Sequence, residues 1–272
     1  NKNIKKLLKS KSYIIDKLII KAWKHNNLEN KEVSLIAVGG YGRSELFPFS
    51  DIDILILISD YDDEKLLKNI EKFIADIWHF KTSVGHSVRT QKECIDAMNS
   101  DLTIYTNLLE SRWICGNIEQ YESLKKNIFG NNEWSNQNFL SAKKKEKEKR
   151  YRKYSNTGYL LEPDIKEGPG GFRDLQTLIW ISKKYFKTNS LADLYNINII
   201  SKKEYLLLLR SQRFLSKTRF FLHLINNKPE ERLFFSNQKK LAEFFGYFCD
   251  TNKGVERFMQ EFYKHISVVK QL

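Results

Sequence analysis

Two carboxylates stand at the start of a very apolar run, in the segment SDIDILILI at 50–58. Because side chains alternate along a strand, Asp51 and Asp53 point to the same side, one pleat apart. Two unpaired carboxylates at that spacing repel each other at a half-buried site. A divalent cation removes the repulsion, and Mg²⁺ prefers one or two carboxylates together with phosphate oxygens of a substrate. The pair therefore predicts a magnesium site that acts on a phosphate compound.

The glycines just before this pair indicate where a phosphate would lie. The chain has 12 glycines, and Gly39, Gly40 and Gly42 fall between an apolar run at 33–38 and the acidic pair. A Gly-Gly turn lets backbone N–H groups come close to an anion. Each signal is weak alone, since acids often cap strand ends and glycines often make turns. Together, between two buried strands, they predict a phosphate-binding turn beside a metal pair.

A second glycine window, EPDIKEGPGGFRD at 162–174, contains three more glycines and several charged residues. Two interpretations are open. In the first, Lys166 and Arg173, with Glu162 and Asp164, line the far wall of a nucleotide cleft. In the second, the segment is a rigid turn that starts a helix at Asp174.

Hydrophobic periodicity predicts the elements that position these windows. Strands are expected at 33–38, 51–58 and 83–89, with a helix capped by Asp62 or Asp63 between the last two. Thr90 and Glu93 form a capping box for the next helix. Beyond Asp101 nearly everything has helical period: about 101–112, 118–128, 135–155, 174–187, 201–226, 237–246 and 254–270. The lysine-rich N-terminal stretch is expected to be an amphipathic helix.

This order of elements predicts an α+β protein with two domains. Residues 1–130 form a small mixed-sheet domain that includes the N-terminal helix, and residues 131–272 form an all-helical domain. The chain begins with Asn1 and ends inside a helical pattern, which predicts that it is part of a longer protein.

Composition limits the class of protein. The net charge of +13 comes from 46 basic and 33 acidic residues, which indicates either a polyanionic partner or a source rich in lysine. The three cysteines form no CxxC pair, which favours reduced thiols in a cytoplasm over disulfides or a zinc site. No apolar run approaches the roughly 20 residues that cross a bilayer.

The segment GGYGRSELFPFSDIDILIL at 39–57 resembles the signature of DNA polymerase β-like nucleotidyltransferases. Within that superfamily it is similar to the bifunctional uridylyltransferase/uridylyl-removing enzymes (GlnD). The segments VGHSVRT (84–90), DLTIYTNLLESR (101–112) and EPDIKEGPGGFRDLQTLIW (162–180) resemble later parts of the same family, in the same order.

The resemblance implies a polymerase β-like nucleotidyltransferase domain followed by a helical domain of the PII-uridylyltransferase type. It implies a Mg²⁺-dependent transfer of UMP from UTP to a tyrosine of the PII nitrogen-regulatory protein, with release of pyrophosphate. In that reaction Asp51 and Asp53 are the catalytic residues and hold two Mg²⁺ ions. The expected nucleotide-binding residues are Gly39, Gly40, Arg43, Ser44, Lys166 and Arg173.

Three features depart from the family pattern. Relatives commonly have a third carboxylate on the strand after Asp-x-Asp, but SVGHSVR has none, so either Asp101 or Glu110 substitutes or two acids suffice. The loop reads GRSELFP where relatives often have GRGELHP, which puts Ser44 and Phe47 at altered positions. None of the five histidines precedes an aspartate, so the metal-dependent hydrolase that removes UMP is not expected in this chain.

Two other functions remain open. One is a different polymerase β-like transferase acting on RNA, a small molecule or another protein, although no aromatic-basic motif for nucleic acid is present. The other is a non-catalytic regulatory domain that binds a nucleotide without turnover. The sequence does not indicate which base is recognised.

Overall fold

The structure is a computed structural model that describes residues 4–29, 32–80, 82–131, 133–154, 160–248 and 253–271. The chain divides into two compact units, residues 1–135 and 136–272. Each unit has its own set of elements and is described separately below.

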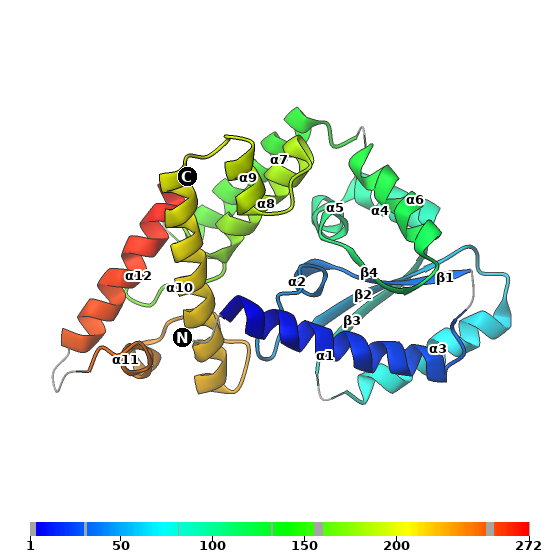
Figure 1. The fold of residues 1–272 in the computed structure, drawn as a ribbon, viewed down its shortest axis with the longest axis horizontal. Helices are drawn as coiled ribbons and strands as arrows, with labels where there is room; N and C mark the ends of the chain where they lie inside the picture. The colour runs from blue at the N-terminus through cyan, green and yellow to red at the C-terminus, as the bar shows by residue number, and fades with distance from the viewer. Residues whose placement is uncertain are drawn as a thin grey trace. The chain divides into compact units, whose positions relative to one another are not determined.

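The first unit is built on a mixed four-stranded sheet with the strand order β3-β2-β1-β4. Strand β1 runs antiparallel to β2 and β4, whereas β2 and β3 are parallel. Helices α1 and α3 cover one face of the sheet, and α4, α5 and α6 lie on the other (Figure 1). The elements are α1 Ile4–His25, β1 Val33–Ala37, α2 Gly39–Gly42, β2 Ile52–Ile58, α3 Glu64–Trp78, β3 Val84–Thr90, α4 Gln91–Ser100, α5 Leu102–Leu109, β4 Arg112–Gly116 and α6 Ile118–Phe129.

The alternation of β2 sorts its side chains between the two faces. Ile54 and Ile56 are buried in one apolar cluster with Trp23 of α1 and Phe73 of α3. The Trp23 and Phe73 rings meet edge to face with their centroids 5.1 Å apart. Asp53, one residue before Ile54, must therefore point to the other face of the sheet, away from α1 and α3.

Local sequence signals start the helices of this unit as predicted. Asp63 caps α3 by accepting hydrogen bonds from the backbone N–H groups of Lys65 and Leu66. Thr90 and Glu93 form the expected capping box at the start of α4. The predicted N-terminal helix is also confirmed. Two of its apolar residues, Leu7 and Leu18, are 42% and 45% exposed.

One strand of the sheet was not predicted. The expectation that nearly everything beyond Asp101 is helical is wrong at residues 112–116, which form β4 and pair with β1. The strand is only five residues long, and its sequence RWICG does not alternate between apolar and polar residues. In the structure only Ile114 of this strand is buried. Its place in the sheet comes from pairing with β1, about 80 residues earlier in the chain, and not from its own sequence.

The second unit is helical. Its helices are α7 Asn136–Arg152, α8 Phe172–Phe186, α9 Leu191–Asn196, α10 Lys202–Asn226, α11 Phe235–Phe244 and α12 Lys253–Gln271. Helix α8 begins two residues before the predicted start, and the short α9 was not predicted. Within the described part of this unit, the only extended pairing is an isolated bridge between Asp164 and Arg232. The predicted α+β class, a small mixed sheet followed by a helical region, is confirmed.

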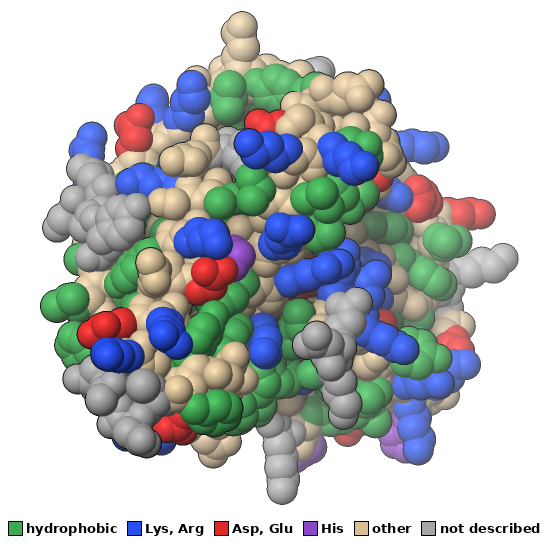
Figure 2. Space-filling view, turned by 60° about the vertical axis from the view of Figure 1, so that its left-hand side comes forward, with side chains coloured by type: hydrophobic (Ala, Val, Ile, Leu, Met, Phe, Trp, Pro, Cys, Tyr) green, Lys and Arg blue, Asp and Glu red, His purple; other side chains and the backbone are tan. Residues whose placement is uncertain are grey.

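The surface reflects the excess of basic residues. Lys and Arg side chains outnumber Asp and Glu side chains on the face shown in Figure 2. Among the described residues, no helix is both long enough and apolar enough to cross a membrane.

Two of the three cysteines lie in described segments. Cys94 and Cys115 are free. Burial raises the pKa of each thiol to about 12, so both are protonated at neutral pH. Cys249 lies outside the described residues.

Candidate active site

Asp53 lies between two glycines that leave room for its carboxylate. A Cβ atom at Gly39 would stand 3.4 Å from Asp53 Oδ2, and a Cβ atom at Gly85 would stand 2.6 Å from Oδ1. Gly85 is the residue of β3 directly opposite Asp53 in the sheet. The backbone N–H of Val38 donates to the carbonyl oxygen of Asp53 over 3.0 Å, which ties the start of the glycine turn to the same residue. The structure thus brings Asp53 and Gly39 together.

Asp51 is exposed and stands just before β2 begins at Ile52. Its spacing from Asp53 places both carboxylates on the same side of the chain if the extended backbone continues to Asp51. The backbone N–H of Ile52 donates to Ser83 O over 2.9 Å, so the parallel pairing with the β3 segment already holds at this point.

The glycine turn itself is a single helical turn, α2. Gly39 has φ +56°, a left-handed conformation that favours glycine. The N-cap residue Val38 makes no side-chain capping bond. The N–H groups of a first helical turn have no partner within the helix, so they are suited to bind an anion. Gly42 closes the turn against α5, because a Cβ atom there would lie 2.3 Å from Glu110 O.

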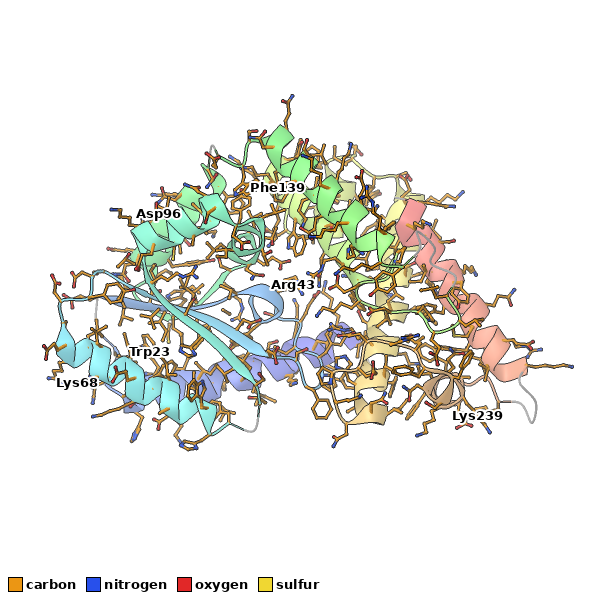
Figure 3. The ribbon with its side chains drawn as sticks, turned by 180° about the vertical axis from the view of Figure 1, so that it is seen from behind. Trp23, Arg43, Lys68, Asp96, Phe139 and Lys239 are labelled. Carbon is orange, nitrogen blue, oxygen red and sulfur yellow. The ribbon has the colours of Figure 1, made fainter. Side chains whose placement is uncertain are left out.

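Arg43 follows the turn and is held by two carboxylates. Its Nε donates to Glu45 Oε2 over 2.9 Å, and its Nη1 donates to Glu110 Oε2. Burial lowers the pKa of Arg43, but the charges of Glu110 and Glu45 outweigh burial and raise the pKa above its usual value. Figure 3 labels Arg43 beside α2. The guanidinium is therefore a fixed cation next to the turn.

The structure gives no support to a third carboxylate from Asp101 or Glu110. Asp101 caps α5 by accepting from the N–H groups of Thr103 and Ile104, and Glu110 is paired with Arg43. Over the described segments, no group of three or more His, Cys, Asp or Glu residues is arranged to hold a metal ion. The acidic pair remains the candidate site.

Ser44 has a left-handed backbone, with φ +58°. Its N–H donates to Tyr41 O over 3.0 Å, so this conformation is part of how the turn closes. A non-glycine residue in this conformation is strained. Glycine at this position would adopt the same conformation without that strain.

Sequence reasoning missed Asn107 of α5. Its Oδ1 would lie 3.6 Å from a Cβ atom at Gly39, so it stands beside the same turn as Asp53. The available signal was the amide in TNLL at 106–109, which directly precedes two leucines. His86, in contrast, is exposed and contacts Trp78 with ring centroids 5.7 Å apart. It neighbours Gly85 in the strand and therefore points away from Asp53.

The glycines of the second window pack against backbone. Cβ atoms at Gly168, Gly170 and Gly171 would lie 2.4 Å from Asp164 O, 2.3 Å from Ile266 O and 2.6 Å from Ile165 O, respectively. Gly170 also has φ +79°. The turn is therefore compact and closely packed on α12.

The charged residues of this window bind one another. Asp164 Oδ1 accepts from the N–H groups of Lys166 and Glu167 over 2.8 and 2.7 Å. Arg173 donates to Glu167 Oε1 through Nη2 over 2.9 Å and to Gln176 Oε1 through Nη1 over 2.9 Å. Lys166 is half-buried. These contacts hold the turn rigid, and nucleotide binding by Lys166 and Arg173 stays a prediction.

Comparison with known proteins identifies the family. Residues 16–166 match the sequence model of the nucleotidyltransferase domain, and residues 138–272 match that of GlnD PII-uridylyltransferase. The two matches cover the glycine turn, the acidic pair and the second window. The chain belongs to the nucleotidyltransferase-domain family, and its residues 138–272 belong to the GlnD PII-uridylyltransferase family.

Similar proteins align over nearly the whole chain. A bifunctional uridylyltransferase/uridylyl-removing enzyme of Hydrogenovibrio crunogenus is 42% identical over 99% of this chain, which covers 31% of that enzyme. Enzymes with the same description from Aliivibrio fischeri and Ectopseudomonas mendocina are 41% and 38% identical over 100% of the chain. The chain spans 30–31% of the length of these GlnD relatives. The expected resemblance is confirmed.

Proposed function

We propose that this chain transfers UMP from UTP to a tyrosine hydroxyl of a PII protein and releases pyrophosphate. The observation that carries the proposal is the Asp53 carboxylate, set between Gly39 and Gly85 beside the glycine turn. Similarity to the GlnD enzymes supports PII as the acceptor and UTP as the nucleotide. Residues 1–130 form the nucleotidyltransferase domain and residues 131–272 the helical domain in this proposal.

The residues present fit a magnesium site. A Cβ atom at Gly85 would stand 2.6 Å from Asp53 Oδ1, so glycine at this position avoids a clash with the carboxylate. Carboxylate oxygens are the donors that Mg²⁺ prefers, and Asp51 and Asp53 would hold the ions. Bound Mg²⁺ neutralises triphosphate charge and stabilises the charge that develops during transfer.

The remaining residues bind and orient the nucleotide. The N–H groups of Gly39 and Gly40 bind the β and γ phosphates, with the Ser44 hydroxyl and the fixed Arg43 cation beside them. The tyrosine oxygen attacks the α phosphorus and loses its proton to water, while the bond from that phosphorus to the bridging oxygen breaks and pyrophosphate leaves with the electron pair. Such a transfer depends mainly on positioning and electrostatics, so no protein nucleophile is needed. Lys166 and Arg173 are proposed as further nucleotide contacts.

The test is incubation of this chain with PII, Mg²⁺ and labelled UTP, with ATP, RNA and a PII variant lacking the tyrosine in parallel. The expected result is labelled PII with UTP only, and no label on the tyrosine-free variant. Label on RNA would favour the RNA-directed alternative, and tight UTP binding without transfer would favour a regulatory domain. In a second incubation, UMP on pre-modified PII is expected to stay in place, because no hydrolase motif is present.

A further inference from the structure

Helix α1 makes two contacts with the loop that runs from Gly39, at the start of the glycine turn, to the acidic pair. The Tyr41 hydroxyl, in the middle of the turn, donates to Asp16 Oδ1 over 2.5 Å. Lys11, on the same helix, donates from Nζ to the backbone carbonyl of Phe47 over 2.6 Å. Phe47 lies four residues before Asp51, so α1 holds the loop near both of its ends.

The contact at Tyr41 is built from charged and buried groups. Tyr41 is fully buried, and Arg112 of β4 binds Asp16 with two hydrogen bonds of 2.9 and 3.0 Å. Arg112 Nη2 also donates to Tyr41 O over 3.4 Å, and the guanidinium lies 5.3 Å from the centre of the Tyr41 ring. The Asp16 side chain is 17% exposed. Because a bidentate arginine fixes the orientation of a carboxylate, Asp16 offers Tyr41 an acceptor in one defined place.

These contacts bear on the site because Tyr41 stands between Gly40 and Gly42. Glycines flanking a residue give the backbone little intrinsic preference for one conformation. The buried side chain of Tyr41 therefore adds a constraint to the backbone hydrogen bonds that set where the N–H groups of Gly39 and Gly40 point. The Lys11 contact constrains the other end of the loop, and burial lowers the pKa of that lysine.

We propose that Asp16 is a positioning residue, which acts through Tyr41 to fix the glycine turn for the triphosphate of UTP, with Lys11 holding the far end of the loop. Helix α1 is then part of the transferase centre, not only a cover for the sheet. This inference rests on the proposed function for its kinetic consequence. The geometric claim, that Asp16 and Tyr41 order the turn, stands apart from it.

The first experiment measures the turn without any substrate. Amide hydrogen exchange is compared in the wild-type chain, Tyr41→Phe and Asp16→Asn, at Gly42, Arg43 and Glu45, whose N–H groups bond to Val38, Gly39 and Gly40. Exchange at these amides is expected to rise about ten-fold or more in both variants, while the amides of α3 stay unchanged. Unchanged exchange at the turn would overturn the proposal.

The second experiment measures transfer to PII per folded molecule. Both variants are expected to lose on the order of ten- to a hundred-fold in kcat/KM for UTP, because small misplacements of binding groups are costly in rate. The KM for PII should not change. Lys11→Met, which removes the contact with Phe47 and leaves Tyr41 intact, is expected to shift the same parameter less.

Tyr105→Phe is the matched control, since Tyr105 is also fully buried and its hydroxyl donates to Ile128 O of α6 over 3.3 Å. It should lower the melting temperature without changing kcat/KM for UTP. If Tyr41→Phe and Asp16→Asn behave like this control, both residues are merely structural and the proposal is wrong. Absence of transfer by the wild-type chain would instead contradict the proposed function. The exchange measurement would still decide whether Asp16 and Tyr41 order the turn.

Discussion

The two glycine windows share a sequence pattern and differ in what their glycines approach. In the first window Gly39 approaches a carboxylate oxygen of Asp53, as does Gly85 on β3, although Gly42 packs against Glu110 O. At Gly168, Gly170 and Gly171 the neighbouring atoms are backbone carbonyl oxygens of Asp164, Ile266 and Ile165. Gly39 and Gly85 leave space for a side chain that can do chemistry, whereas the glycines of the second window let the chain fold tightly onto itself.

The aspartates near the two windows differ in the same way. In the second window Asp174 is buried and accepts hydrogen bonds from Arg150, the Tyr151 hydroxyl and the N–H of Gly170. Asp164 and Arg173 likewise bind their own turn. In the first window Asp51 is exposed and precedes the strand. A dense glycine pattern therefore indicates that the backbone comes close to another group. Whether that group is a reactive side chain or a backbone carbonyl distinguishes a ligand site from a packed turn.

The largest effect is expected from Asp53→Asn, with Asp51→Asn next. Loss of one carboxylate from the metal pair removes several kcal/mol of electrostatic stabilisation, so transfer to PII should fall about a thousand-fold or more. The melting temperature without Mg²⁺ should change little. Asp96→Asn, an exposed residue on α4 shown in Figure 3, is the matched control and should transfer normally. Near wild-type turnover by Asp53→Asn would contradict the proposal that Asp53 holds Mg²⁺.

Adding a methyl group beside Asp53 and another in the second window tests the comparison directly. In Gly85→Ala the new Cβ atom would lie 2.6 Å from Asp53 Oδ1, so the carboxylate must move, and transfer should fall on the order of a hundred-fold with a small loss of stability. In Gly170→Ala the Cβ atom would lie 2.3 Å from Ile266 O at φ +79°, so the variant should lose about 2 kcal/mol or more of stability.

The readouts of this pair are kcat per folded molecule and the free energy of unfolding. Turnover per folded Gly170→Ala molecule should stay near wild type. If both substitutions lower only kcat, or both lower only the free energy of unfolding, the distinction between a glycine beside the Asp53 carboxylate and a glycine in a packed turn is wrong.

The sequence predicted what depends on neighbouring residues. Strand alternation and the spacing between Gly39 and Asp53 placed the turn beside the acidic strand, and the capping residues Asp63 and Thr90 marked helix starts. Strand β4 was missed because its partner lies far away in the chain. The pairing of Arg43 with Glu110 and of Tyr41 with Asp16 could not be predicted either. Each joins residues on different elements, and no local pattern specifies which charges meet after folding.

Lys166→Ala and Arg173→Ala test whether the second window also binds the nucleotide. If each side chain contributes one charge-assisted contact to UTP, the KM for UTP should rise about five- to ten-fold. Arg173→Ala should also lower the melting temperature, because Glu167 and Gln176 lose their partner. A lower melting temperature with unchanged KM for UTP would assign both residues to the turn alone. Lys184→Ala, on α8 outside the turn, serves as the control.

The smallest effects are expected at Ser44, where strain and a proposed phosphate contact act in opposite directions. Ser44→Gly relieves a left-handed φ of +58°, worth about 1–2 kcal/mol, and loses about 0.5–1 kcal/mol through the greater freedom of the unfolded chain, so stability should rise by up to about 1.5 kcal/mol. Loss of the hydroxyl should raise the KM for UTP about three-fold, the value of one modest hydrogen bond.

Ser44→Ala loses the hydroxyl and keeps the strain, so it should show the higher KM without the gain in stability. Ser50→Gly, at a position without the left-handed backbone, should be destabilised slightly. An unchanged KM in both Ser44 variants would leave the residue as a strained turn position that makes no contact with the phosphates, and the first window would then bind UTP through its backbone and Arg43 alone.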